Sequence, residues 1–189
     1  MSQYFNKIKG DLFRYEGKFS LFLLLRYFFF VPGFRYTTLL RYVQQCSILT
    51  KWFWILVLRS HQVKYGIQIP YRVKIGNGFR IVHWGAIVIN PSARIGHNFN
   101  IAQGALIGNA PPSSRNNNQG GAPTIGNNVC VGANAIVIGK ITIGDNCIIA
   151  PGAFVNQNMP PNTIAIGNPA SFHHKDNASK SLIVYKLDL

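Results

Sequence analysis

Residues 125–155 have the sequence IGNNVCVGANAIVIGKITIGDNCIIAPGAFV, in which an aliphatic residue returns at every sixth position. These positions are Ile125, Val131, Val137, Ile143, Ile149 and Val155. A second apolar or small residue stands two places before most of them, and Gly, Asn or Asp occupies the positions between, as in Gly126–Asn128. Such residues tolerate the positive φ angles of tight corners. A period of six predicts short flat strands joined by corners, because a helix requires a period of 3.6.

The same period extends upstream. Aliphatic residues keep the six-residue spacing at Ile89, Ile95, Ile101 and Ile107. This repeat predicts a parallel β-helix in which three hexads make one coil. Between Ile75 and Val155 there is room for about four to five coils of roughly eighteen residues. Because each coil buries its aliphatic residues only against its neighbours, the stack needs a cap at both ends.

Two irregularities interrupt the repeat. The spacing from Ile81 to Ile89 is eight residues, and the extra residues fall around Val82–Gly85. Asn109–Pro123 (NAPPSSRNNNQGGAP) has no inward aliphatic residue and predicts an excursion loop over residues 109–123. A long polar loop on a rigid scaffold is often functional, and a solvated insertion is the alternative.

The chain divides into three parts by pattern. Residues 1–65 are basic and rich in aromatic residues, and apolar spacing predicts three short helices over Phe19–Val31, Thr37–Gln45 and Ile48–His61, with a break at Pro32–Gly33. Residues 66–170 form the predicted β-helix domain. Residues 171–189 form a tail in which Leu182–Tyr185 could add a strand or a cap.

Charge restricts the classes of partner. The 189 residues carry a formal net charge of +14, and residues 1–74 hold twelve Lys and Arg against two acids. Such a charge attracts nucleic acid, an anionic membrane or a phosphorylated ligand. The basic residues are interleaved with large apolar residues and no nucleic-acid motif is present, so we expect no nucleic-acid partner. The apolar runs are too short to cross a membrane and no cleavage site follows them, so we expect a cytoplasmic protein. Three cysteines without paired spacing predict free thiols.

The segment from Gly66 to Ala170 resembles the hexapeptide-repeat acyltransferases, and within them the serine acetyltransferase-like branch. The resemblance is carried by VCVGANAIVIGKITIGDNCIIAPGAFVNQNMPPNTIAIGNPA and its closing Gly167–Ala170 (GNPA). It implies a mainly β fold, a left-handed parallel β-helix preceded by a short α-helical N-terminal region. It further implies a homotrimer with active sites between adjacent subunits and acetyl-CoA as co-substrate.

The resemblance assigns the general base to His83. An imidazole titrates near neutral pH, so it can accept the proton of a hydroxyl and later return it. The irregular spacing independently places His83 at a bulged corner, away from the aliphatic stack. Trp84, next to His83, and His97, beside Gly96 at a corner, are candidates for the acceptor site. Residues expected to bind the coenzyme are Gly108, Asn109, Ala133 and Pro151, with Lys140 as a phosphate partner.

Departures from the serine-specific pattern affect the expected acceptor. The family's base-orienting Asp is replaced by Gln68, which can donate a hydrogen bond but cannot stabilise an imidazolium as a carboxylate does. A second Asp is replaced by Val82, and a His before the re-entry Pro is replaced by Ala122. The glycine-rich turn after the long coil is changed to Ile107–Asn109. These changes disfavour free serine as the acceptor.

The remaining pattern is similar to relatives that O-acetylate sugars of bacterial capsule, exopolysaccharide or O-antigen. We therefore expect transfer of acetyl to a sugar hydroxyl, with a sugar or lipid-linked saccharide as acceptor and peripheral contact with the inner membrane face. Serine O-acetyltransferase-type chemistry is one alternative, and a non-catalytic basic solenoid that binds membrane or nucleic acid is another. A metal-dependent enzyme on this fold would need three His, and only His83 and His97 lie within the coils, so no metal is expected.

Overall fold

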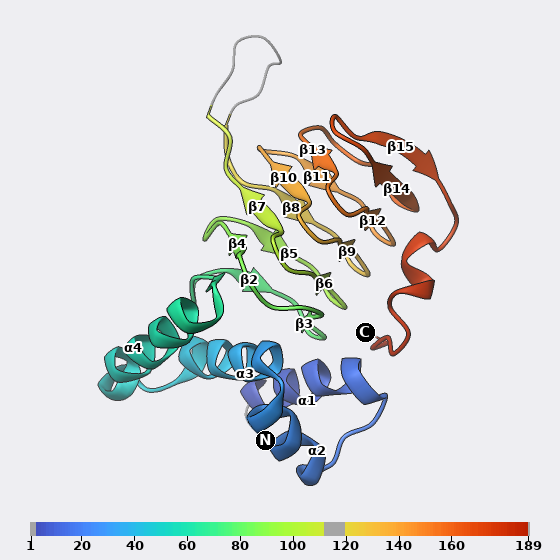
Figure 1. Cartoon of the computed structure of the whole chain (residues 1–189). Helices are drawn as coiled ribbons and strands as arrows, with labels where there is room; N and C mark the ends of the chain where they lie inside the picture. The colour runs from blue at the N-terminus through green and yellow to red at the C-terminus, as the bar shows by residue number, and fades with distance from the viewer. Residues whose placement is uncertain (1–2, 112–119, 189) are drawn as a thin grey trace.

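The computed structural model describes residues 3–111 and 120–188, and Figure 1 shows helices gathered at one end of a column of short strands. The helices are α1 (Gln3–Glu16), α2 (Leu21–Phe30), α3 (Pro32–Gln45) and α4 (Ile48–Tyr65). The strands are β1 (Ile67–Gln68), β2 (Lys74–Ile75), β3 (Arg80–Ile81), β4 (Ile87–Ile89), β5 (Arg94–Ile95), β6 (Asn100–Ile101), β7 (Leu106–Gly108), β8 (Thr124–Ile125), β9 (Cys130–Val131), β10 (Ile136–Ile138), β11 (Thr142–Ile143), β12 (Ile148–Ile149), β13 (Phe154–Val155), β14 (Thr163–Ile166) and β15 (Ser171–His174). A 3-10 helix covers Ala178–Ser181.

The strands form three sheets that run the length of the column. Sheet A has the order β1-β4-β7-β10-β13, sheet B has β2-β5-β8-β11, and sheet C has β3-β6-β9-β12-β14-β15. Consecutive strands up to β12 lie in different sheets and each pairs in parallel with the strand one coil away, so the chain winds as a β-helix. Only β15 in sheet C pairs in the antiparallel direction, with β14.

The aliphatic repeat forms the core of this column. All ten repeat residues from Ile89 to Val155 are at most 6% exposed, and Cys147 fills one of the small inward positions with no exposed surface. The predicted inward register is therefore confirmed. Each coil buries these side chains against the coils above and below, which makes the stack the main source of stability.

Asparagines build the corner between sheets B and C. Asn98, Asn128 and Asn146 all have positive φ, a conformation that Asn adopts more easily than most residues. Their side chains form a ladder, because the Asn98 amide donates to Asn128 Oδ1 at 3.0 Å and the Asn128 amide donates to Asn146 Oδ1 at 2.9 Å. The same residues thus turn the chain and join neighbouring coils.

Both predicted irregularities are present. Arg80 pairs with Asn100 and Val88 with Leu106, so the corner Val82–Ala86 is two residues longer than its neighbour in the next coil. The excursion leaves the column at Asn109 and closes through a bridge between Ala110 and Gly121, while Asn109 Oδ1 accepts a 2.7 Å hydrogen bond from the Gly121 amide. Residues 112–119 of this loop lie outside the described residues.

The three predicted helices are present as α2, α3 and α4, and the described residues 3–65 hold one further helix that was not predicted. Ser20 caps α2 by accepting from the Leu23 amide, Pro32 begins α3, and Gly66 at φ +61° ends α4. The missed helix is α1. It is held by a buried ion pair in which Arg41 Nε lies 2.9 Å from Asp11 Oδ2, and Asp11 Oδ1 also accepts from the Phe79 amide at 2.8 Å.

The C-terminal tail runs back beside sheet C. Leu182–Tyr185 form no strand, and the antiparallel strand β15 lies earlier, at Ser171–His174. The Asn100 amide donates to the Leu182 carbonyl at 3.1 Å, and Arg14 Nη1 donates to the Tyr185 carbonyl at 2.6 Å. The tail thus covers the outer side of the first coils together with α1.

Candidate active site

His83 stands at the long corner between sheets C and A. The corner Val82–Ala86 turns through Gly85 at φ +118° and Ala86 at φ +50°, and the Gly104 amide holds it by donating to the Gly85 carbonyl at 2.8 Å. The His83 side chain is exposed and has no hydrogen bond to another described residue. The unprotonated nitrogen of the neutral ring is therefore open to an acceptor hydroxyl, which is the requirement for a general base.

Trp84 lies beside His83 and is anchored on the helices. Its ring is 50% exposed and meets the Tyr65 ring edge-on, with ring centroids 5.8 Å apart. The Tyr65 hydroxyl in turn accepts a 2.8 Å hydrogen bond from Arg35 Nη1. The contact fixes the bulged corner against the end of α4, and Trp84 presents an aromatic face next to the imidazole.

Strand pairing aligns a row of residues with His83. Ile81, Ile101, Val131 and Ile149 occupy matching places in sheet C. Two residues after each of them stand, respectively, His83, Gln103, Ala133 and Pro151. The structure therefore brings the predicted coenzyme-binding residues Ala133 and Pro151 to the same corner as His83. Gln103 was not predicted, and counting two residues past Ile101 would have found it.

The other predicted coenzyme-binding residues lie at a different corner. Gly108 ends β7 and pairs with Ile138, and Asn109 and Lys140 follow these strands at the corner between sheets A and B. Sheet A separates this corner from His83. Its outward residues between the two corners are apolar: Val88, Leu106, Ile136 and Phe154. A single ligand that touches both predicted groups in one chain must cross this apolar face.

Gln68 is not bonded to His83 within one chain. Gln68 lies on β1 in sheet A, exposed and opposite Val88, and no hydrogen bond joins it to the imidazole. Its base-orienting role stays a prediction.

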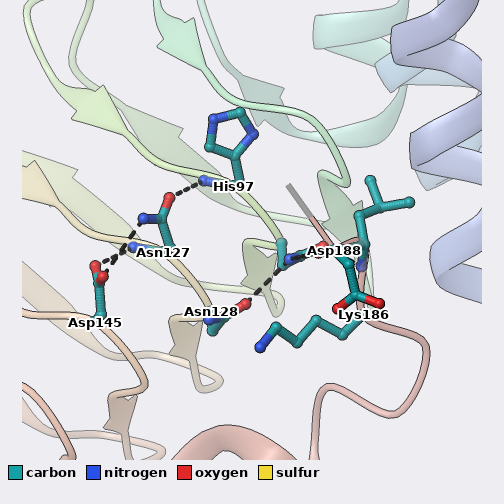
Figure 2. A pocket seen from close by; sticks show the side chains of 8 residues that line it. His97, Asn127, Asn128, Asp145, Lys186 and Asp188 are labelled. Carbon is teal, nitrogen blue, oxygen red and sulfur yellow. Dashed lines mark hydrogen bonds between the residues drawn. The ribbon is translucent and has the colours of Figure 1, made fainter.

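His97 lies at the corner between sheets B and C, so one chain does not bring it together with His83. His97, Asn127, Asp145 and Lys186 are among the residues that line a cavity of about 260 Å³. Figure 2 shows their side chains from close by. His97 Nδ1 accepts a 3.1 Å hydrogen bond from the Asn77 amide, which places the proton of the neutral ring on Nε2. In this tautomer the remaining ring nitrogen of His97, Nε2, is a hydrogen-bond donor.

The cysteines and the possible metal ligands of the described residues were the other candidates for chemistry. The three cysteines are free, and burial raises the pKa of the Cys130 thiol to about 11, so it stays protonated at neutral pH. Within residues 3–111 and 120–188, no three His, Cys, Asp or Glu side chains are grouped closely enough to hold a metal ion.

Comparison with known proteins identifies the repeat. Residues 122–157 match the family model described as bacterial transferase hexapeptide (six repeats). The putative colanic acid biosynthesis acetyltransferase WcaB of Escherichia coli K12 is 37% identical over 106 residues, which cover 56% of this chain and 62% of that protein. A serine acetyltransferase of Helicobacter pylori strain 26695 is 35% identical over 111 residues, covering 59% and 63%. The chain thus spans less than two thirds of the length of these relatives.

Solved structures resemble the whole architecture. A serine acetyltransferase of Neisseria gonorrhoeae superposes with a TM-score of 0.75 at 24% identity, covering 92% of this chain and 67% of that one. The soybean serine acetyltransferase apoenzyme gives a TM-score of 0.73 at 25% identity, covering 90% and 69%. These likenesses confirm the predicted fold class, a left-handed parallel β-helix preceded by helices. Residues 122–157 thus carry the hexapeptide repeat of bacterial transferases, within a chain whose fold resembles that of serine acetyltransferases.

Proposed function

We propose that the protein is an acetyl-CoA-dependent O-acetyltransferase with His83 as general base. His83 removes the proton from an acceptor hydroxyl while the hydroxyl oxygen attacks the thioester carbon of acetyl-CoA. A new C–O ester bond forms, the C–S bond breaks, and the proton passes from the imidazolium to the leaving thiolate. The observation that carries the proposal is the exposed, unbonded imidazole at a bulged corner. The acetyltransferase names of the relatives support it.

The donor occupies the row of small residues above His83. Ala133 and Pro151 leave room for an extended pantetheine arm beside the corner, and Gly108, Asn109 and Lys140 extend the proposed site to the far edge of sheet A. In this proposal the active unit is a homotrimer, since a neighbouring subunit would close the site that one chain leaves open. The neighbour also supplies whatever orients the imidazole, unless Gln68 moves to do so when the acceptor binds.

The acceptor in this proposal is a sugar hydroxyl. The chain has five acids, and none of them stands near His83 in sequence. Asp11 pairs with Arg41, Glu16 accepts from the Tyr27 hydroxyl, and Asp176 pairs with His174. Asp145 lies at the corner of sheets B and C, and Asp188 lies in the tail. Without a carboxylate at the His83 corner, one chain has no partner for an amino acid's ammonium group, whereas a neutral sugar needs none.

Serine remains the second candidate, because several relatives and solved structures are named serine acetyltransferases. Purified protein incubated with acetyl-CoA separates the two. We expect CoA release, measured by chromatography, with deacetylated bacterial polysaccharides and none with serine. Release with serine alone would favour the second candidate. A folded protein that binds no CoA, and releases none with either class of acceptor, would contradict the transferase proposal and favour a non-catalytic solenoid. We further propose that the enzyme works at the inner face of the membrane, on lipid-linked saccharides.

A further inference from the structure

We infer that α2 and α4 dock on an anionic lipid bilayer and hold the His83 corner at the level of the lipid headgroups. The docking half of this inference stands on the helices alone. The second half rests on the proposed function, because it makes the acceptor a saccharide carried on a lipid.

One side of α2 is apolar and uncovered. Leu21, Phe22, Leu25, Phe29 and Phe30 are each at least 50% exposed. The opposite side packs on α1 and α3 through Leu23, which is buried, and through Leu24 and Tyr27. The outward residues therefore do not contribute to the core of the helical region.

The outer side of α4 is more exposed still. Its outward residues are each more than 60% exposed: Ile48, Leu49, Trp52, Phe53, Leu56 and Val63. We call this set and the outward residues of α2 together the α2–α4 face. Soluble monomers rarely leave so much apolar surface in water, so this face meets a partner.

Charge selects the partner. Lys18, Arg26, Lys51, Arg59 and Lys64 lie in α2 and α4 or next to them in sequence, and the sequence has no acid between Glu16 and Asp145. A second copy of this face would bring cation against cation with no carboxylate to pair. Anionic headgroups supply the missing charge, and helices with an aromatic apolar side and basic edges lie in the bilayer interface. No helix in the described part of the chain is long and apolar enough to cross a bilayer, so contact is with its surface.

Arg35 connects the α2–α4 face to the candidate active site. Its Nε donates to the Phe28 carbonyl at 2.6 Å and its Nη2 donates to the Phe29 carbonyl, at the end of α2. Its Nη1 donates to the Tyr65 hydroxyl at the end of α4, and the Tyr65 ring contacts Trp84. The ends of both helices and the His83 corner therefore meet around one guanidinium. Trp84 and Val82 at this corner are themselves partly exposed and apolar, and in our inference they lie at the level of the bilayer surface.

Co-sedimentation of the full-length protein with vesicles tests the docking. We expect binding to phosphatidylcholine vesicles that contain about 30 mol % phosphatidylglycerol, little binding without it, and loss of binding at about 0.5 M salt. Phe22→Ser or Trp52→Ser should weaken binding about tenfold each, and Lys18→Gln or Arg59→Gln about fivefold each. All four side chains are largely exposed, so their removal opens no cavity. Val184→Ser, at a residue 68% exposed in the C-terminal tail, is the matched control and should bind normally.

Trp fluorescence tests the orientation. In the Trp52→Phe/Trp54→Phe variant, Trp84 is the sole Trp, and brominated anionic lipids should quench its emission. Binding without quenching of Trp84 would overturn the placement of the His83 corner. Absence of binding, with a particle mass that grows as protein concentration rises, would overturn the docking and assign the α2–α4 face to a second copy. Neither measurement uses acetyl-CoA or an acceptor, so a failure here is distinguishable from a failure of the proposed reaction.

Discussion

Replacing Asp11 with Ala should detach α1 from the coil and destabilise the protein strongly. Asp11 is 1% exposed and holds three groups: Arg41 Nε at 2.9 Å, Arg41 Nη2 at 3.2 Å and the Phe79 amide at 2.8 Å. The substitution leaves a buried guanidinium without its counter-charge, which costs about 3–5 kcal/mol in comparable pairs. Arg41 still donates to the carbonyls of Ile75 and Gly76, so the lower end of that range is expected, about 3 kcal/mol.

Thermal unfolding at fixed protein concentration measures this loss. For a chain of this length, about 3 kcal/mol corresponds to a decrease in Tm of roughly 6–12 °C. The matched control is Asp176→Ala, whose partner is His174 in an ion pair with both side chains at least 70% exposed. That change should cost less than about 0.5 kcal/mol. If Asp11→Ala shifted Tm no further than the control, the contacts of Asp11 with Arg41 of α3 and with the Phe79 amide of the coil would not be what holds α1 in place.

Two further predictions concern the column. Asn128→Ala removes two side-chain hydrogen bonds of the asparagine ladder and places Ala at φ +55°. It should lower the free energy of unfolding in urea by about 2–3 kcal/mol. Asn128→Gly should lower it less, because Gly tolerates that backbone angle. Equal losses would show that the backbone angle contributes nothing. The Cys130 thiol should resist alkylation at pH 8 in the native protein and react once the chain is unfolded, because its pKa is raised from 9.0 to about 11. Since the unfolded chain releases this proton first, the stability linked to Cys130 is fully present below pH 9 and declines toward pH 11; an unchanged Tm across that interval would contradict the burial.

The β-helix could be predicted because its buried residues recur at a fixed spacing in the sequence. An aliphatic inward residue recurs at every sixth position. Each of them packs against residues of the same type in the neighbouring coil. The long corner at His83 could be found for the same reason, since two extra residues between Ile81 and Ile89 interrupt a period that holds from Ile89 to Ile107 and from Ile125 to Val155.

Elements held by long-range polar contacts could not be predicted in this way. The sequence of α1, QYFNKIKGDLFRYE, has an apolar side at helical spacing, formed by Tyr4, Ile8, Leu12 and Tyr15, but a Gly in its middle weakens the signal. Its place against the coil is set by Asp11 and Arg14, which bond to residues more than sixty positions away. Similarly, the tail lies along sheet C because Asn98 and Asn100 bond its backbone, and a local pattern contains no sign of either contact.

In the candidate site too, local spacing predicted some residues, and others depend on long-range pairing. Sequence placed His83 at a bulge, but only strand pairing shows that Ala133 and Pro151 share its corner while Gly108, Asn109 and Lys140 do not. The twelve extra residues of the excursion hide this register from simple counting. His97 is a candidate acceptor-site residue from its place in the sequence, but the structure puts it at another corner and bonds its Nδ1 to the Asn77 amide.

The rate of acetyl transfer by His83→Ala tests the central claim most directly. Removal of a general base lowers a rate by about 10²–10⁴-fold. Because the His83 side chain is exposed and unbonded in the described chain, Tm should stay near that of the unmodified protein. His173→Ala, at an exposed residue of β15, is the matched control and should keep full activity. The account predicts a loss of at least a hundredfold with an unchanged Tm; a rate within a few-fold of the unmodified protein would show that His83 is not the base.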